Sequence, residues 1–165
     1  MSKKPLILGI ESSCDETAAS LITENEEGFP VVLSNIVSSQ VEVHKEFGGV
    51  VPELAARSHI EKIDWIVKKA IDESGRKIEE IDAVASTAGP GLIVCLSVGL
   101  SFGKAFATAM KGLLREEAIA FPKLNPTDKQ TIRPGPAVAA TASISSSFIP
   151  LSSIAFFVIR SIFSI

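Results

Sequence analysis

The sequence predicts an α/β fold in which helices pack against a mixed sheet. Three short apolar or alternating runs, at residues 6–11, 17–23 and 31–38, have the length and β-branched content of strands. A long run at helical spacing follows, from Pro52 to Ser74. A fourth strand is then predicted from Ile81 to Thr87, before a nearly uncharged run from Leu92 to Met110. Consecutive strands followed by helix, strand and helix favour a sheet with both antiparallel and parallel neighbours.

Length and composition fit one globular domain and exclude several other classes. The chain has 165 residues, of which 46% are hydrophobic and 21% charged, as expected for a folded protein with a core. Its net charge of −3 provides no general basic field for nucleic acid, which argues against tRNA binding by this chain alone. Cys14 and Cys95 are far apart, and the start MSKKP leads into too short an apolar segment for a signal peptide. We therefore expect reduced thiols and a cytoplasmic location.

The first three strands are expected to form an antiparallel meander. The segment ESSCDE joins the first two, and the polar tip from Asn25 to Gly28 joins the second and third. Short polar connections of this kind, with glycine, are typical of hairpins.

The helix from Pro52 to Ser74 has clear start and stop signals. Pro52 and Glu53 suit a first turn, and Gly75 follows as a C-terminal stop. Its apolar stripe is predicted to contain Ile60, Ile63, Val67, Ala70 and Ile71.

Three other side chains near this helix carry separate predictions. Trp65 lies off the apolar stripe, so it either covers a neighbouring loop, the favoured interpretation, or is exposed as an anchor for a partner. His59 lies at the edge of the stripe and is expected at the edge of the core, not as a metal ligand. His44 is expected to be solvated.

The run from Leu92 to Met110 has Lys104 as its only charge, and its length approaches that of a membrane span. Its start directly after a glycine-rich turn favours instead a buried helix of a soluble domain. Gly99 and Gly103 would then let another helix or strand approach closely.

The character of the chain changes from Pro122 onward. A proline-rich polar segment leads into a serine-rich tail with Arg160 as its only charge after Pro134. We therefore divide the chain into a domain at 1–121 and an irregular tail at 122–165. The uncharged stretch from Ala137 to Ile159 is at most a poor membrane span, because it contains many serines and Pro150.

Two segments are candidates for a binding site. In the turn Glu11, Ser12, Ser13, Cys14, Asp15, backbone N–H groups and hydroxyls lie together and suit a phosphate, and Asp15 with Glu16 could hold a divalent cation or a water. The alternative is an ordinary hairpin turn, with Cys14 a small packed thiol instead of a reactive one.

The second candidate segment is Gly89, Pro90, Gly91, at the start of a helix. Backbone N–H groups at a helix N-terminus favour an anion, and glycine allows close approach, although a plain turn with a helix cap would have the same sequence. If the first and fourth strands pair, Ser86 and Thr87 would point into the same cleft as the turn that contains Glu11.

Three stretches resemble one family. GIESSCDETA, FGGVVPELAARSH (Phe47 to His59) and STAGPGLIVCLSVGLSFGKAFA (Ser86 to Ala107) are similar, in the same order, to the N-terminal portion of the TsaD family. These are tRNA threonylcarbamoyladenosine synthases, formerly labelled O-sialoglycoprotein endopeptidases. The resemblance covers residues 6 to about 110 and then stops.

The resemblance implies a ribonuclease H-like half domain, shared with actin-like ATPases and sugar kinases. It implies a transferase that moves threonylcarbamoyl from threonylcarbamoyl-AMP, made with ATP, onto N6 of adenosine 37 in tRNA. The cleft formed by the two candidate segments would hold the nucleotide. Glu11 stands where actin-like ATPases place an acidic residue that positions a metal-bound water, although it could equally be a strand-end carboxylate bonded to nearby N–H groups.

The family's metal site is missing from the sequence. The family uses one divalent metal, iron or zinc, held by a His-x-x-x-His pair, whereas His44 and His59 are fifteen residues apart and are the only histidines. We therefore expect this chain alone to be inactive, and the tail to be foreign to the family through a frame change or a truncated gene model.

The resemblance also implies partners, namely a TsaB-type paralogue bound through the N-terminal helices, a TsaE-type ATPase, and tRNA. Two other functions stay open. One is a non-catalytic module that binds the TsaB-type partner, and the other is a phosphotransferase fragment of the same fold. A peptidase finds no support, because no nucleophile–base pair or metalloprotease spacing is present.

Overall fold

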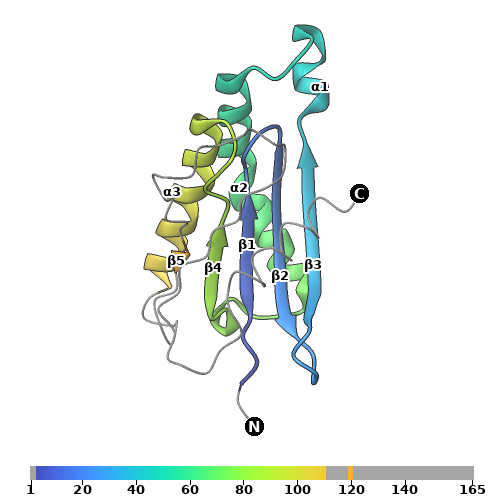
Figure 1. Cartoon of the computed structure of the whole chain (residues 1–165), viewed down its shortest axis with the longest axis vertical. Helices are drawn as coiled ribbons and strands as arrows, with labels where there is room; N and C mark the ends of the chain where they lie inside the picture. Colours follow the sequence, from blue (N-terminus) through green and yellow to red (C-terminus); the bar gives the residue numbers. More distant parts are fainter. Residues whose placement is uncertain (1–2, 111–118, 121–165) are drawn as a thin grey trace, which may run out of the picture.

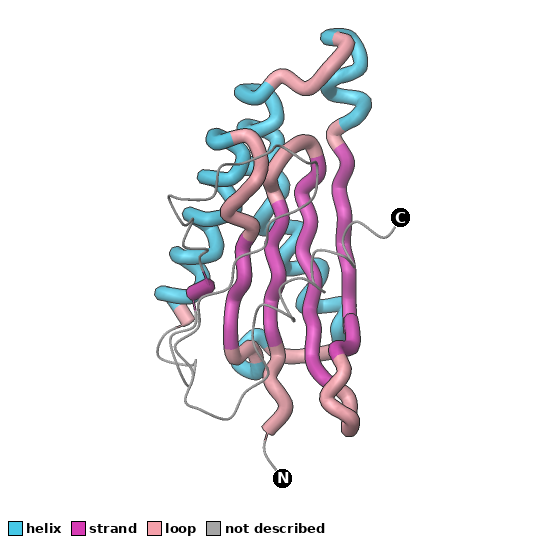
Figure 2. Tube along the Cα trace, in the orientation of Figure 1, coloured by secondary structure: helices cyan, strands magenta, loops and turns pink. Residues whose placement is uncertain are grey.

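A computed structural model describes residues 3–110 and 119–120 of the chain. They form one five-stranded sheet with the order β3-β2-β1-β4-β5 (Figures 1 and 2). The strands are β1 (Ile7–Glu11), β2 (Glu16–Glu24), β3 (Pro30–Ser39), β4 (Ala83–Ser86) and β5 (Ile119–Ala120).

The pairing confirms the predicted mixed sheet. β1, β2 and β3 are antiparallel neighbours, whereas β4 runs parallel to β1 on one side and to β5 on the other. An antiparallel meander extended by a parallel strand is the expected first part of a ribonuclease H-like fold.

The helices are α1 (Val41–His44), the 3-10 turn η1 (Lys45–Phe47), α2 (Pro52–Ser74), the 3-10 turn η2 (Ile78–Glu80) and α3 (Ile93–Ala109). α2 and α3 cover one face of the sheet, and α1 projects beyond the end where β3 finishes (Figure 1). One core joins strand residues such as Leu8 and Ile10 with Ile63 and Val67 of α2 and Ala107 of α3. The short α1 and η1 were not predicted.

α2 has the predicted bounds because its ends are specified locally. Pro52 fits the first turn, where no backbone N–H is needed within the helix. Gly75 adopts the left-handed conformation, with φ of 68°, and its N–H donates to the carbonyl of Asp72. Burial confirms Ile63, Val67, Ala70 and Ile71, but Ile60 is wrong, because its side chain is 63% exposed.

The glycines of α3 permit the close approach that the sequence predicts. A Cβ at Gly99 would overlap with the hydroxyl of Ser12 at the end of β1, and a Cβ at Gly103 would overlap with the hydroxyl of Ser86 in β4. α3 therefore rests directly on the two central parallel strands.

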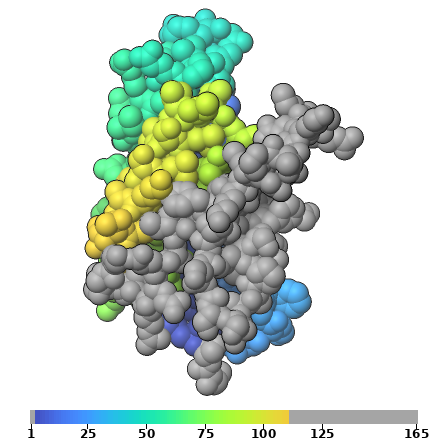
Figure 3. Space-filling view, turned by 60° about the vertical axis from the view of Figure 1, so that its left-hand side comes forward, coloured from blue at the N-terminus to red at the C-terminus, as the bar shows by residue number. Residues whose placement is uncertain are grey.

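α3 is not a fully buried helix, which corrects the prediction. One side packs on the sheet through Cys95, Leu96 and Ala107, but the opposite side lies on the surface (Figure 3). Ile93, at its first turn, is 81% exposed. Within residues 3–110 and 119–120, no helix is both long and apolar enough to cross a membrane. The proposed linker and tail at 122–165 lie outside the described residues.

Candidate functional site

The two predicted site segments lie in contact where β1 and β4 end (Figure 1). The N–H of Leu92, which follows Gly91, donates to the carbonyl oxygen of Ser13 across 2.8 Å. A Cβ at Gly91 would come within 2.6 Å of that same oxygen, so only glycine lets the loop pack this tightly on the turn. At Gly89, φ is 153°, a conformation that also favours glycine. The fold thus brings Gly89, Pro90 and Gly91 against the turn.

Glu11 has a buried carboxylate, with the residue 2% exposed, and hydrogen bonds to this carboxylate stabilise the turn. One of its oxygens accepts a hydrogen bond from the N–H of Ser13 across 2.6 Å, and the other accepts one from the Thr87 hydroxyl. This is the geometry of a strand-end carboxylate bonded to a nearby N–H group. A role in positioning a metal-bound water stays a prediction.

Ser12 is engaged inside the fold. Its hydroxyl donates to the carbonyl of Cys95 across 2.9 Å and accepts from the N–H of Gly99 across 3.1 Å. Both hydrogen-bonding functions of Ser12 therefore connect β1 to α3.

Ser86 and Thr87 point in different directions, because successive strand residues alternate. Thr87 reaches Glu11, as the predicted cleft requires, whereas the Ser86 hydroxyl donates to the carbonyl of Gly99 beneath α3. Only Thr87 belongs to the site.

Three consecutive backbone carbonyls of the turn, at Ser13, Cys14 and Asp15, accept hydrogen bonds from residues outside the turn. Leu92 N–H donates to the carbonyl of Ser13, the His59 ring to that of Cys14 across 3.0 Å, and Gln40 N–H to that of Asp15 across 2.9 Å. In a trans peptide the N–H points opposite to the C=O, so the N–H groups of Cys14 and Asp15 face away from the first two of these partners. Among the described residues neither N–H group has a hydrogen-bond partner. Adjacent free N–H groups in a turn are suited to an anion.

The Cys14 thiol is poorly suited to be a nucleophile. Burial, together with a hydrogen bond to Asp15 and its negative charge, raises the pKa of Cys14 to about 12. The thiol stays protonated at neutral pH, which favours the packed-thiol interpretation. Burial and the neighbouring Asp15 also raise the pKa of Glu16 above its usual value.

The two histidines are buried, and each has hydrogen-bonding partners at both ring nitrogens. In His59, Nε2 lies 3.0 Å from the Cys14 carbonyl oxygen and Nδ1 lies 2.7 Å from the Thr17 hydroxyl. Burial lowers the pKa of His59. Its predicted role as a core histidine is confirmed.

His44 was wrongly expected to be solvated. Its Nε2 lies 3.3 Å from Oε1 of Gln40, and its Nδ1 accepts from the N–H of Val51 across 3.4 Å. The chain between α1 and α2 folds back over the ring, which local periodicity does not show. Sequence reasoning also missed Gln40, whose fully buried amide lies between the two histidines.

The described residues do not fit the family's divalent metal. Across the described part of the chain, no three His, Cys, Asp or Glu side chains gather in a way that would hold a metal ion. Both imidazoles are committed to protein partners, and Asp15 and Glu16 have no third ligand beside them.

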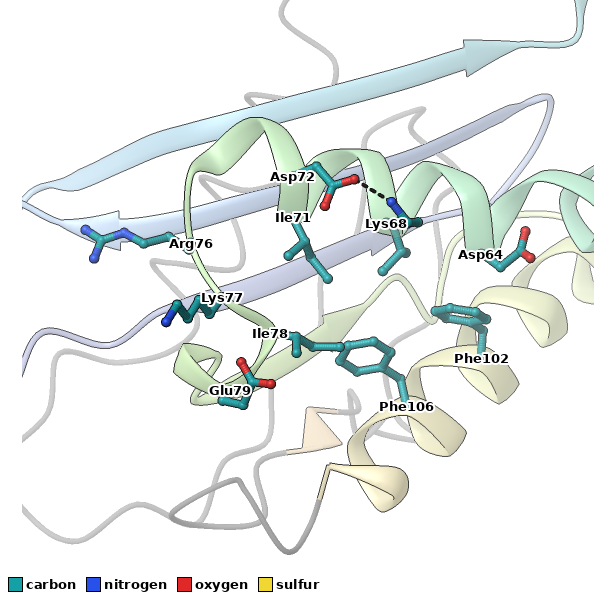
Figure 4. Close-up of a pocket in the computed structure, with 11 residues that line it drawn as sticks. Asp64, Lys68, Ile71, Asp72, Arg76, Lys77, Ile78, Glu79, Phe102 and Phe106 are labelled. Carbon is teal, nitrogen blue, oxygen red and sulfur yellow. Dashed lines mark hydrogen bonds and ion pairs between the residues drawn. The ribbon is translucent and has the colours of Figure 1, made fainter.

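A separate groove of about 400 Å³ opens between the C-terminal half of α2, α3 and residues 76–79 (Figure 4). Its apolar wall includes Ile71, Ile78, Phe102 and Phe106, and charged side chains such as Lys68 and Asp72 form its rim. None of the predicted site residues lines it.

Trp65 is an exposed aromatic residue on α2. Its side chain is 53% accessible, and the ammonium of Lys69 lies 5.3 Å from the ring centroid. Both interpretations, that Trp65 lies over a neighbouring loop and that it anchors a partner, stay predictions.

Comparisons with known proteins agree with the motifs. The family model for TsaD, tRNA N6-adenosine threonylcarbamoyltransferase, matches residues 31–114. The enzyme of that name from Pelagibacter ubique is 77% identical over 110 residues, which are 67% of this chain and 31% of the relative. That from Caldicellulosiruptor saccharolyticus is 50% identical over 131 residues, covering 73% of this chain and 38% of the relative.

A solved structure, YeaZ from Pseudomonas aeruginosa, aligns with a TM-score of 0.47 and 18% identity over 70% of this chain and 42% of its own. The chain spans about a third of the length of the curated relatives it matches. The family match and the three motifs together show that this chain belongs to the TsaD family of tRNA N6-adenosine threonylcarbamoyltransferases.

Proposed function

We propose that this chain forms the phosphate-binding side of a threonylcarbamoyl transferase site. The turn from Ser13 to Asp15 would bind the phosphate of threonylcarbamoyl-AMP, or the phosphates of the ATP from which it is made, opposite Gly89, Pro90 and Gly91. The observation that carries the proposal is the pair of N–H groups at Cys14 and Asp15, which are free among the described residues.

The surrounding residues would hold this turn in place. Glu11 and Thr87 fasten its first half to the end of β4, and Ser12 anchors it to α3. Gly91 lets the loop before α3 lie against Ser13, so that both segments could face one ligand.

In the family reaction the threonylcarbamoyl carbonyl carbon forms a bond with N6 of adenosine, its bond to the phosphate oxygen breaks, and AMP leaves while the amine loses a proton. A turn that binds the phosphate would orient the adenylate and stabilise the departing AMP. The family's metal, iron or zinc, would polarise the carbonyl when bound, and this chain's described residues do not supply its ligands.

Nucleotide binding tests the proposal. We expect saturable binding of ATP and of AMP to the 165-residue chain by calorimetry. Gly91→Ala should weaken it at least tenfold, because the added Cβ would come within 2.6 Å of the Ser13 carbonyl oxygen. Gly49→Ala is the matched control, since a Cβ there meets no atom within 4 Å. Absence of binding to the folded chain, or equal affinities for the two variants, would overturn the proposal.

Transfer of threonylcarbamoyl to tRNA by the purified chain is not expected. The sequence has only His44 and His59, and both are used inside the fold. Formation of threonylcarbamoyladenosine in a tRNA assay with the adenylate supplied would contradict this expectation.

A second function, binding of a TsaB-type partner, is favoured by exposed apolar side chains on the two long helices. Ile60 and Trp65 of α2 and Ile93 and Val94 of α3 are all exposed. The partner would bind through these helices, and the TsaE-type ATPase and tRNA would join the assembly. Family membership favours acyl transfer over a phosphotransferase fragment.

Co-elution with a TsaB-type protein on size exclusion tests this function. Ile93→Asp should abolish a complex, because a charge would replace an exposed apolar side chain at the interface. Ser101→Asp, at another exposed position of α3, is the control. No complex with the native chain, or equal retention by both variants, would reject the partner-binding function.

A further inference from the structure

A buried chain of polar side chains connects the start of α2 to the candidate phosphate-binding turn. The N–H of Val51 lies 3.4 Å from Nδ1 of His44, and Nε2 of His44 lies 3.3 Å from Oε1 of Gln40. Nε2 of Gln40 then lies 3.3 Å from Nδ1 of His59, whose Nε2 lies 3.0 Å from the carbonyl oxygen of Cys14. Each of the three side chains is at most 4% exposed.

The chemistry of the two ends fixes the direction of every hydrogen bond. A backbone N–H can only donate, so Nδ1 of His44 accepts and its proton is on Nε2. His44 then donates to the Gln40 carbonyl oxygen, which leaves the amide nitrogen of Gln40 to donate to Nδ1 of His59. His59 in turn carries its proton on Nε2 and donates to the Cys14 carbonyl, which can only accept. Both rings are neutral, and all four hydrogen bonds run the same way.

The last hydrogen bond determines which way a peptide of the turn faces. Because the Cys14 carbonyl points at His59, the N–H of Asp15 in the same peptide points away from His59. A second contact supports this arrangement, since the Thr17 hydroxyl lies 2.7 Å from Nδ1 of His59. Gln40 contributes twice, because its own backbone N–H binds the carbonyl of Asp15 across 2.9 Å.

We propose that His44, Gln40 and His59 are positioning residues that hold the Cys14–Asp15 peptide with its N–H directed to a bound phosphate. The identity of that ligand rests on the proposed function, whereas the orientation of the peptide does not. The three residues would act through the turn and would not touch the substrate themselves.

Protonation of the His59 ring would place two donors opposite each other and break the order of these hydrogen bonds. A proton on Nδ1 of His59 would face the amide nitrogen of Gln40. The ionisable groups that act on His59 are Glu11 and Asp15 from the turn and Lys62 from its own helix, and Cys14 contacts the ring through its carbonyl oxygen. His44 faces it from α1, through Gln40. The series of hydrogen bonds from Val51 to Cys14 should therefore hold the turn at neutral pH and release it in acid.

Four proteins test the proposal, all in the 165-residue chain. In His59→Leu the hydrogen bond to Cys14 is lost, whereas in His59→Gln the side-chain amide can donate to Cys14 and its oxygen can accept from Thr17. Gln40→Leu interrupts the chain one step earlier. Ser58→Ala changes a neighbouring buried residue of α2 and is the matched control.

The readouts are the ¹H–¹⁵N amide resonance of Asp15, whose position depends on the orientation of its peptide, the calorimetric affinity for ATP, and the ¹⁵N shifts of the His59 ring. We expect the Asp15 amide resonance to move and ATP binding to be about tenfold weaker in His59→Leu and Gln40→Leu. His59→Gln should restore most of both properties, and Ser58→Ala should behave as the native chain. ATP affinity should fall in the native chain as the pH decreases below 6.5, the ordinary pKa of histidine, and less so in His59→Gln.

The outcomes separate this proposal from the proposed function. If the native chain does not bind ATP, the proposed function fails, while the amide resonance of Asp15 still tests the positioning role. A folded His59→Leu in which the Asp15 amide resonance is unchanged would overturn the role. If His59→Leu does not fold, the ¹⁵N shifts of the His59 ring in the native chain decide. A proton on Nδ1 of His59 at pH 7.5 would contradict the proposal, because Nδ1 must accept a hydrogen bond from Gln40.

Discussion

The two ends of the α2 and α3 pair are built from different interactions. At the end where β1 and β4 finish, buried polar groups such as Glu11, Ser12 and Thr87 bind one another or the backbone. At the other end, Ile78 and Phe106 line an open groove, and ion pairs lie on its rim. The groove therefore lies at the end of the helix pair that contains none of the predicted site residues.

The difference shows how each end resists change. A buried polar group that loses its partner keeps the cost of its desolvation, so single substitutions should matter most around the turn. Exposed ion pairs on the rim of an open groove tolerate change, because water can hydrate the group that remains. Single substitutions at the two ends measure this contrast.

The largest effect is expected at the contact between α3 and the turn. Gly99→Ala would place a Cβ against the hydroxyl of Ser12 and displace both of its hydrogen bonds. We expect the free energy of unfolding to fall by about 3 kcal/mol, measured by urea denaturation. Gly49→Ala, with open space around it, should change it by less than about 0.5 kcal/mol.

The double variant Gly99→Ala with Ser12→Ala sharpens this test. Removal of the hydroxyl makes room for the new methyl group, so part of the loss should be recovered. A double variant as unstable as the sum of the two single ones would mean that the overlap with Ser12 is not the cause.

A smaller effect is expected for the carboxylate at the end of β1. Thr87→Val keeps the side-chain shape but removes the hydroxyl that donates to buried Glu11. The free energy of unfolding should fall by about 2 kcal/mol. Thr108→Val, at an exposed position of α3, should have an effect within about 0.5 kcal/mol. Equal losses at the two positions would remove the contrast between buried and exposed hydroxyls.

Acidification should weaken the turn end through His59. Its pKa is lowered in the folded protein, so the unfolded chain takes up a proton first as the pH falls through 6.5. The stabilising contribution is complete above pH 6.5 and decreases as the pH falls from there to the lowered pKa, by at most about 1.4 kcal/mol per pH unit.

Urea denaturation of the native chain and of His59→Gln at pH 7.5 and 5.5 measures the contribution of His59 to the free energy of unfolding. The difference between the two proteins should shrink at the lower pH, because glutamine does not titrate. The raised pKa of Glu16 acts in the opposite direction, with stability lost as the pH rises above 4.5, and is common to both proteins. A pH-independent difference would contradict the buried neutral ring.

Local sequence signals predicted the elements well where their ends are specified by special residues. Pro52 and Gly75 fixed the bounds of α2, and the glycines of α3 indicated the close approach to strands. Pairing of the first and fourth strands placed Thr87 beside the turn that contains Glu11, as predicted, but Ser86 faces α3 instead. The three motifs also predicted the family.

What the sequence could not show depends on tertiary neighbours. Ile60 has helical spacing with Val67, yet it is exposed, because periodicity does not reveal where a covering element ends. His44 has a polar local sequence but is buried, and Gln40 carries no motif at all. Hydrogen bonds offset the burial of both polar residues. Gln40 binds Ala55 and His59 of α2, and His44 binds Gln40 and the N–H of Val51.

The smallest effect is expected on the rim of the groove. Lys68 and Asp72 form an i,i+4 ion pair of 2.7 Å, with side chains 74% and 61% exposed. Lys68→Gln should lower the free energy of unfolding by only about 0.3 kcal/mol. Water screens the attraction between these two exposed charges, and holding both side chains in one geometry costs conformational entropy. The loss should vanish in 1 M salt, at which the screening length is about 3 Å. A loss above about 1 kcal/mol that persists in salt would show that this rim is as tightly coupled as the turn, and the contrast between the two ends would not hold.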